Sequence, residues 1–160
     1  ARRIESPSEV LQAVNRELMQ VNDTGYFVTA LYGILHDSDG KFHYARAGHS
    51  VPLLLDAGRQ PVEVGHGVGH PLGLFEEMLV DEASLDLVPG SMLLLYTDGV
   101  TEAVDAQGEF FGDERLLAAL QSIIGTGPDQ TCEAIWSALQ AYQAGASQED
   151  DVTLLAVGVR

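Results

Sequence analysis

The stretch LLLYTDGVTEA, residues 93–103, places an acidic residue and a glycine at the abrupt end of an apolar run. The run Met92–Tyr96 carries no charge, which is typical of a strand at the centre of a sheet that is covered on both faces. Thr97, Asp98 and Gly99 then end it. An Asp-Gly pair is most often a plain turn. The same pair can also hold a carboxylate at the end of a buried strand where something binds.

A second group of acidic residues precedes another apolar run. Residues 149–151, Glu-Asp-Asp, stand directly before residues 152–159, which we predict to be a buried strand. If the two strands are antiparallel neighbours, the end of the first lies beside the start of the second. Asp98 and Asp150 would then meet at one edge of the sheet, with their carboxylates roughly 4–7 Å apart.

Clustered carboxylates repel each other, so one of them takes up a proton more readily or the group binds a cation. Ligands that are all oxygen favour Mg²⁺ or Mn²⁺ over Zn²⁺. Gly99 suits such a site, since glycine lets the backbone turn sharply or approach an ion closely. From residue types and spacing alone, a metal site and a pair of ordinary polar loop ends both stay open.

Further strands surround these two. Residues 38–40, Ser-Asp-Gly, belong to a turn signal that predicts a β-hairpin. Short turns between successive strands favour antiparallel pairing. The predicted helices are segregated along the chain rather than alternating with strands, which indicates an α+β protein. The predicted strands are residues 27–35, Lys41–Ala47, and residues 52–55, 61–64 and 79–88, the last of which alternates between apolar and polar positions.

The N-terminal part of the chain predicts a helix. Residues 6–9, Ser-Pro-Ser-Glu, have the pattern of a capping box with proline at the first helical position. Val10, Val14 and Leu18 then recur at helical spacing, so we expect the helix to continue to about residue 21.

Two more helices are predicted between residue 110 and the last strand. Asp113 can cap a helix over residues 114–124. Either Asp129 or Thr131 begins a second helix, and Gly145 stands where a C-terminal glycine belongs.

The composition limits the function classes. A chain of 160 residues fits one domain, residues 1–160, and its net charge of −16 argues against a nucleic-acid partner. No apolar stretch approaches the ~18 residues of a membrane span. A single cysteine, Cys132, excludes an internal disulfide framework and a cysteine zinc cage, which fits a cytoplasmic protein. We expect the single tryptophan, Trp136, in the core.

Six segments taken together resemble one protein family. They occur in the order and approximate spacing seen in bacterial metal-dependent PPM-type serine/threonine phosphatases, in the branch of the sporulation stage II E and sigma-B regulators. The resemblance covers essentially the whole chain. The segments are FVTALYGIL, YARAGHSVPLLL, GHPLGL, LLLYTDGVTEA, FFGDERL and EDDVTLLAVGV.

The resemblance implies an α-β-β-α sandwich of two antiparallel sheets flanked by helices, with two Mn²⁺ or Mg²⁺ ions at one end. It assigns Asp98 and Asp150 as metal-ligand carboxylates. Asp151 is a secondary candidate, because its position often carries an amide in relatives outside this branch. Gly99 and His49 are candidates near the substrate, although His49 in AGHSVP could instead shape a tight turn between strands.

One family motif has no counterpart. The first metal motif, a Gly-Asp pair followed by a Gly-His-Gly-like stretch, should lie upstream of residues 1–3. The resemblance therefore predicts an N-terminally incomplete domain that is inactive by itself. An exposed strand edge and the apolar face of the first helix would favour a homo-oligomer.

The resemblance predicts phosphoserine/phosphothreonine hydrolysis by the parent protein in a bacterial signalling cascade. Its substrate would be a phosphorylated anti-sigma-factor antagonist of the small STAS-domain type. The alternative is a non-catalytic regulatory or docking domain with the same sandwich. The presence of both Asp98 and Asp150 favours the enzyme.

Overall fold

The computed structural model describes residues 6–23, 25–36, 38–65, 67–123, 127–146, 148 and 150–159. The chain divides into two compact units, each made of two stretches of sequence. Unit 1 comprises Ala1–Val51 and Gly65–Asp86, and unit 2 comprises Pro52–Val64 and Leu87–Arg160. Each unit holds its own sheet, and the assignment of residues 1–160 to a single domain stays a prediction.

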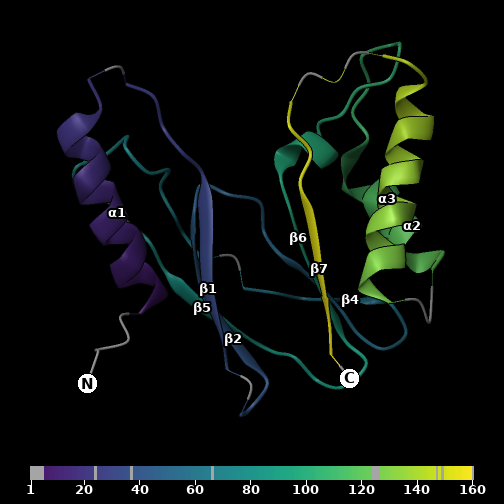
Figure 1. The fold of residues 1–160 in the computed structure, drawn as a ribbon, viewed down its shortest axis with the longest axis horizontal. Coiled ribbons are helices and arrows are strands. Elements are labelled where there is room, and N and C mark those ends of the chain that lie inside the picture. The colour runs from purple at the N-terminus through teal and green to yellow at the C-terminus, as the bar shows by residue number, and fades with distance from the viewer. Residues whose placement is uncertain are drawn as a thin grey trace. The chain divides into compact units, whose positions relative to one another are not determined.

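Unit 1 contains a three-stranded antiparallel sheet in the order β1-β2-β5 (Figure 1). Its strands are β1 (Ala30–His36), β2 (Lys41–Ala47) and β5 (Glu82–Asp86). The predicted hairpin is confirmed, because β1 and β2 pair from Ala30↔Ala47 to His36↔Lys41. β1 begins three residues later than predicted and β5 is shorter than residues 79–88. Val28 and Val80 at these ends pair only in isolated bridges, with Leu72 and Gly69, and do not extend the strands.

Helix α1 (Pro7–Val21) packs against the sheet of unit 1. The predicted capping box is present: Ser6 Oγ accepts from the Glu9 backbone N–H, and the Glu9 carboxylate accepts from Ser6 N–H. Leu18 packs against the core cluster, so the apolar face of α1 is covered there, whereas Val14 is 41% exposed. The cluster consists of Leu11, Ala45, Ala47, Leu72 and Met78.

Unit 2 contains a four-stranded antiparallel sheet in the order β4-β3-β6-β7. Its strands are β3 (Leu53–Leu55), β4 (Pro61–Val62), β6 (Met92–Tyr96) and β7 (Leu154–Gly158). β6 is a buried central strand, as predicted. β7 is an edge strand of the described sheet with Leu155 53% exposed, so the expectation of a buried strand over residues 152–159 is wrong. An apolar run does not by itself distinguish a central strand from an edge strand.

Helices α2 (Gly112–Gln121) and α3 (Pro128–Gln143) lie on one face of this sheet, as Figure 1 shows. They close a core made of apolar side chains from the sheet, the turn after β6 and both helices. That core consists of Leu55, Met92, Leu94, Tyr96, Val100, Ala103, Phe111, Leu116, Leu120, Ile135 and Leu139.

The helix ends differ from the prediction. Phe111, rather than Asp113, is the residue before α2, and Asp113 lies in the first turn, where its charge favours the helix dipole. α3 begins at Pro128 rather than at Asp129 or Thr131, since proline fits the first helical position.

One feature of α3 was also missed: Trp136 is 38% exposed and does not lie in the core. Gly145 has φ +92° directly after the C-cap residue Ala144, so the predicted C-terminal glycine is confirmed, and Ala144 is itself left-handed.

Unit 1 combines an antiparallel sheet with one described helix and unit 2 an antiparallel sheet with two, which confirms the α+β class. None of the helices in the described part of the chain has both the length and the apolar composition of a membrane span.

Candidate functional site

The pairing of β6 with β7 brings the two acidic segments of unit 2 together. The strands are antiparallel, and their last pair at this end is Tyr96↔Leu154. Beyond it the Thr97 N–H donates to the Thr153 carbonyl at 3.2 Å. The residues that follow β6 and those that precede β7 therefore share one edge of the sheet, as the sequence predicted.

Thr97 fastens the two segments to each other through its side chain. Its Oγ1 donates to the Asp151 carbonyl and accepts from the Thr153 N–H, each at 2.9 Å. Sequence reasoning did not single out Thr97. A hydroxyl directly before the Asp-Gly pair was the available signal, because such a group can bond to backbone across a strand end.

Gly99 permits the close approach of the two backbones. It is buried in a short 3-10 helix, η1 (Asp98–Val100). A Cβ at this position would lie 2.5 Å from the Asp151 carbonyl oxygen and 3.1 Å from its carbon. Only glycine fits there without a shift of the backbone, so the Asp-Gly pair joins two segments and is more than a plain turn.

The carboxylates of Asp98, Asp150 and Asp151 all belong to exposed residues. Asp98 Oδ1 accepts from the Gly99 N–H at 3.1 Å, and Asp150 Oδ1 accepts from the Asp151 N–H at 2.7 Å. These bonds orient both groups. An ionised carboxylate offers about four acceptor positions, so one backbone bond leaves oxygen lone pairs for a cation.

No group of three or more His, Cys, Asp or Glu side chains that could hold a metal ion occurs among the described residues. Asp98 and Asp150 offer oxygen donors only, and their joint role in one cation site stays a prediction. Such a donor set fits Mg²⁺ or Mn²⁺ in kind, since Mg²⁺ commonly takes one or two carboxylates and completes its shell with water and phosphate oxygens.

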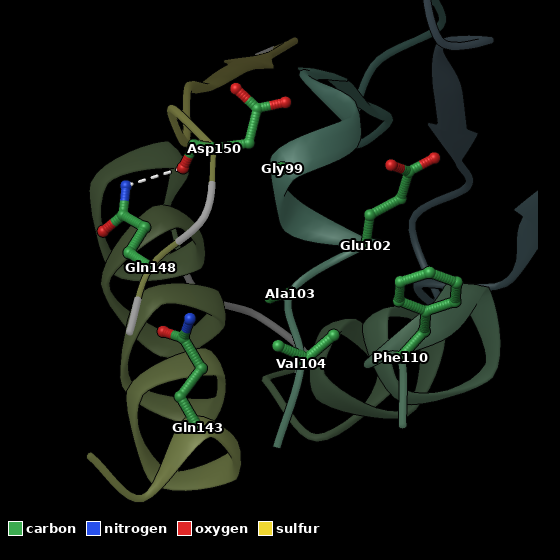
Figure 2. Close-up of a pocket in the computed structure, with 8 residues that line it drawn as sticks. All are labelled: Gly99, Glu102, Ala103, Val104, Phe110, Gln143, Gln148 and Asp150. Atoms are coloured by element: carbon green, nitrogen blue, oxygen red, sulfur yellow. Dashed lines mark hydrogen bonds between the residues drawn. The ribbon is translucent and has the colours of Figure 1, made fainter. Parts of the chain in front are cut away.

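A pocket of about 300 Å³ adjoins this edge (Figure 2). Gly99 and Asp150 belong to its wall, whereas Asp98 does not. Glu102 could have been found from the sequence, because it stands in the same TDGVTEA segment. The two glutamines carried no signal. The lining consists of Gly99, Glu102, Ala103, Val104, Phe110, Gln143, Gln148 and Asp150.

A tight loop presents the apolar wall of the pocket. Val104 and Phe110 face each other in an antiparallel bridge. Between them Asp105 Oδ1 accepts from the N–H groups of Gln107 and Glu109, at 2.9 and 3.0 Å. The hydrogen bonds from the Glu109 and Gln107 backbone lower the pKa of Asp105. Asp105 thus shapes the loop and stays ionised while doing so.

Cys132 lies on α3, away from this wall. It is partly buried, and burial raises the pKa of its thiol. A raised pKa keeps the thiol protonated, which agrees with a structural role rather than a reactive one.

His49 lies in unit 1. The preceding Gly48 has φ +68°, and its N–H donates to the Gly69 carbonyl at 2.9 Å. The His49 ring nitrogen Nδ1 lies 3.3 Å from Thr29 Oγ1, and the Arg46 guanidinium donates to the His49 carbonyl. These contacts favour the interpretation as a turn, and a role near the substrate stays a prediction.

Comparison with known proteins shows the family of the chain. The family model described as Stage II sporulation protein E (SpoIIE) matches residues 1–160. IcfG of Synechocystis is 31% identical over 142 residues, which cover 84% of this chain and 21% of IcfG. Phosphoserine phosphatase RsbP of Bacillus subtilis is 26% identical over an alignment that covers 97% of this chain and 38% of RsbP. The chain thus spans less than half of either relative.

Solved structures share the fold. The SiaA-PP2C domain of Pseudomonas aeruginosa superposes with a TM-score of 0.80 at 21% identity, covering 97% of this chain and 61% of that one. The manganese-presoaked phosphatase domain of SpoIIE from Bacillus subtilis gives 0.69 at 19% identity, covering 99% of this chain and 67% of that one. The expected fold of two antiparallel sheets flanked by helices is therefore confirmed.

Proposed function

Because the chain belongs to the stage II sporulation protein E family, we propose that it forms the catalytic part of a metal-dependent protein serine/threonine phosphatase. One observation carries the proposal. The register of β6 and β7 sets Asp98 and Asp150 at one sheet edge, where Gly99 lets the backbones touch and Thr97 holds them together. The name of the relative RsbP, a phosphoserine phosphatase, supports the same reaction.

Asp98 and Asp150 would hold the cations of this site, and Asp151 is a secondary candidate. Two Mn²⁺ or Mg²⁺ ions would supply Lewis acidity, by activating a water for attack on phosphorus and neutralising charge on the phosphoryl oxygens. The manganese-presoaked SpoIIE structure supports the choice of metal.

Neighbouring residues of the chain position the proposed ligand carboxylates and set their directions. The hydrogen bonds from the Gly99 and Asp151 N–H groups fix the directions of the Asp98 and Asp150 carboxylates. Thr97 keeps the Asp151 carbonyl and the start of β7 against η1. A site held this firmly loses little order when the phosphoryl group binds.

The proposed substrate is a phosphoserine or phosphothreonine on a small cytoplasmic signalling protein, of the STAS-domain antagonist type that the family resemblance implies. The net charge of −16 suits a protein substrate better than a nucleic acid. The charge also suits basic residues around the phosphorylation site.

Hydrolysis of a phosphoserine peptide by the full-length protein tests the proposal, with Mn²⁺ present or removed by a chelator. Asp98→Asn and Asp150→Asn should each lower the turnover at least about 1,000-fold, because each removes an anionic ligand for the cations that would neutralise charge on the phosphoryl group. The matched control is Asp129→Asn, an exposed aspartate on α3, which should leave the rate unchanged.

Two outcomes would contradict the proposal. Near-full activity in Asp98→Asn or Asp150→Asn would show that these residues are not ligands. No Mn²⁺-dependent hydrolysis by the wild type would favour the non-catalytic docking domain instead.

A further inference from the structure

The wall of the pocket beside Asp150 includes the amide of a largely buried glutamine. Gln143 lies in the last turn of α3, lines the pocket, and is only 8% exposed. Its side-chain amide makes no hydrogen bond to any residue in the described part of the chain. In Figure 2 the amide stands on the α3 side of the pocket and points towards Gln148, across from Val104 and Phe110.

An amide in a pocket wall can both donate and accept hydrogen bonds, so Gln143 can contact a polar or charged ligand. The other walls indicate which ligand fits. Phe110 is 60% exposed and, with Val104, forms an apolar side. Glu102 adds an exposed carboxylate, and none of the described residues that line the pocket is basic.

Hydrogen bonds to its backbone hold the loop that carries Phe110 in place. The Tyr142 hydroxyl donates to the Phe110 carbonyl at 3.1 Å and to the Glu109 carbonyl at 2.9 Å. The Arg115 guanidinium donates to the Phe110 carbonyl at 3.0 Å and lies 4.7 Å from the centre of the Tyr142 ring. Phe110 is therefore presented to the pocket by a braced loop, and binding there requires little reordering.

We propose that this pocket receives a lysine or arginine side chain that neighbours the phosphorylated residue of a protein substrate. The aliphatic stem of such a side chain would lie on Val104 and Phe110, where the aromatic ring also attracts a cation. Its charged head would meet the Glu102 carboxylate and the oxygen of the Gln143 amide.

The position of the pocket supports the proposal that it binds a substrate side chain next to the phosphoserine. Asp150 is shared between the pocket wall and the proposed metal site, so the inference rests on the proposed phosphatase function. A volume of about 300 Å³ is at the small end for ligand pockets. It leaves room for one long side chain rather than for a folded element of a partner.

Binding is tested first, without any need for turnover. The ¹⁵N-labelled chain is titrated with two metal-free phosphoserine peptides, one with lysine and one with uncharged norleucine beside the phosphoserine, with each neighbouring position tried. We expect the Gln143 side-chain amide signals to shift with a lysine peptide and much less with its norleucine counterpart. Equal shifts with both, or none with either, would overturn the inference whether or not the protein is a phosphatase.

Hydrolysis by the full-length protein gives the second test. At the favoured position lysine should raise kcat/KM roughly tenfold over norleucine, mainly through KM, because a charge-assisted contact is formed in the ground state as well. This preference should fall below about twofold in Gln143→Leu and in Glu102→Gln, in proportion to the lost contact.

The matched control is Gln140→Leu, an exposed glutamine on the same helix that does not line the pocket, and it should keep the preference. Loss of the preference in Gln140→Leu, or its survival in both pocket variants, would overturn the inference. Hydrolysis of all peptides at one rate would overturn it too while leaving the proposed phosphatase activity intact. A wild type that shows the lysine-specific shift but hydrolyses nothing would instead contradict the phosphatase proposal.

Discussion

Two turns that belong to the family resemblance serve different purposes. The turn at Gly48-His49 in unit 1 uses its glycine to reach a left-handed conformation, and the groups around His49 bond to the backbone of their own unit. The turn at Asp98-Gly99 in unit 2 uses its glycine to bring two chain segments together, and it leaves carboxylate oxygens at the surface. A motif of small and polar residues therefore does not by itself indicate a functional site. The contacts that each side chain makes distinguish the two turns.

Gly99→Ala should have the largest effect on stability and on kcat/KM. The new methyl group would lie 2.5 Å from the Asp151 carbonyl oxygen, so the segment that carries Asp150 must move. We expect a loss of stability of about 2–4 kcal/mol and a fall in kcat/KM of about 100-fold or more, because a 1 Å displacement of a catalytic group has that effect. Chemical denaturation and phosphopeptide hydrolysis measure the two. Full activity would show that the close approach does not position the site.

Gly48→Ala is the corresponding change in the other turn. Its φ of +68° costs an alanine about 1–2 kcal/mol, and a Cβ would also press on Pro71 Cγ at 2.7 Å. We expect lower stability but unchanged activity per folded molecule. Loss of activity in folded Gly48→Ala protein would contradict the difference drawn between the two turns. It would show that the turn at His49 belongs to the active site.

Thr97→Val tests how the two segments of unit 2 are fastened. Valine keeps the shape but loses both 2.9 Å bonds of Oγ1, which should cost about 1–2 kcal/mol. We expect kcat to fall about tenfold with a smaller change in KM, since the residue acts through the position of others. Thr97→Ser, which keeps the hydroxyl, should restore most of the rate.

The smallest expected effect is the pH-dependent contribution of Glu82 in unit 1 to stability. Hydrogen bonds from the hydroxyls of Ser6 and Ser8, and from the Ser8 N–H at 2.9 Å, lower the pKa of Glu82. A carboxyl whose pKa is lower in the folded state adds stability above its unfolded pKa of about 4.3, and this contribution disappears as the pH falls through the folded pKa. Because Glu82 is exposed, we expect less than about 1 kcal/mol.

Denaturation curves between pH 7 and pH 3 of the wild type and of Glu82→Gln measure this contribution. The difference between them should shrink as the pH falls. A difference that is constant with pH would show that the Ser8 contact does not depend on the charge of Glu82.

Much of unit 2 could be predicted because its strands and their ends are marked by residue types that lie close together in the sequence. The charge-free run Met92–Tyr96 indicated a central strand, and acidic residues at the end of one strand and the start of another indicated a shared edge. The pairing of β6 with β7 itself was a condition of that prediction, because the two strands lie far apart in sequence; once they pair, antiparallel geometry sets the end of one beside the start of the other.

Other features could not be read from the chain because they depend on which distant residues meet. The edge position of β7, the exposure of Trp136 and the placement of Phe111 before α2 follow from how strands and helices pack. Apolar residues carry the same signal whether they end up in the core or at its rim.

The sequence by itself determined that two acidic strand ends could meet, through the pattern of apolar runs and the residue types that end them. Only the tertiary structure decided that Gly99 touches Asp151, and that Gln143 faces Phe110 across a pocket. The physical reason is that hydrophobic burial is nearly non-directional. It selects which elements pack together, but the particular contacts arise only when side chains far apart in sequence fill one close-packed space.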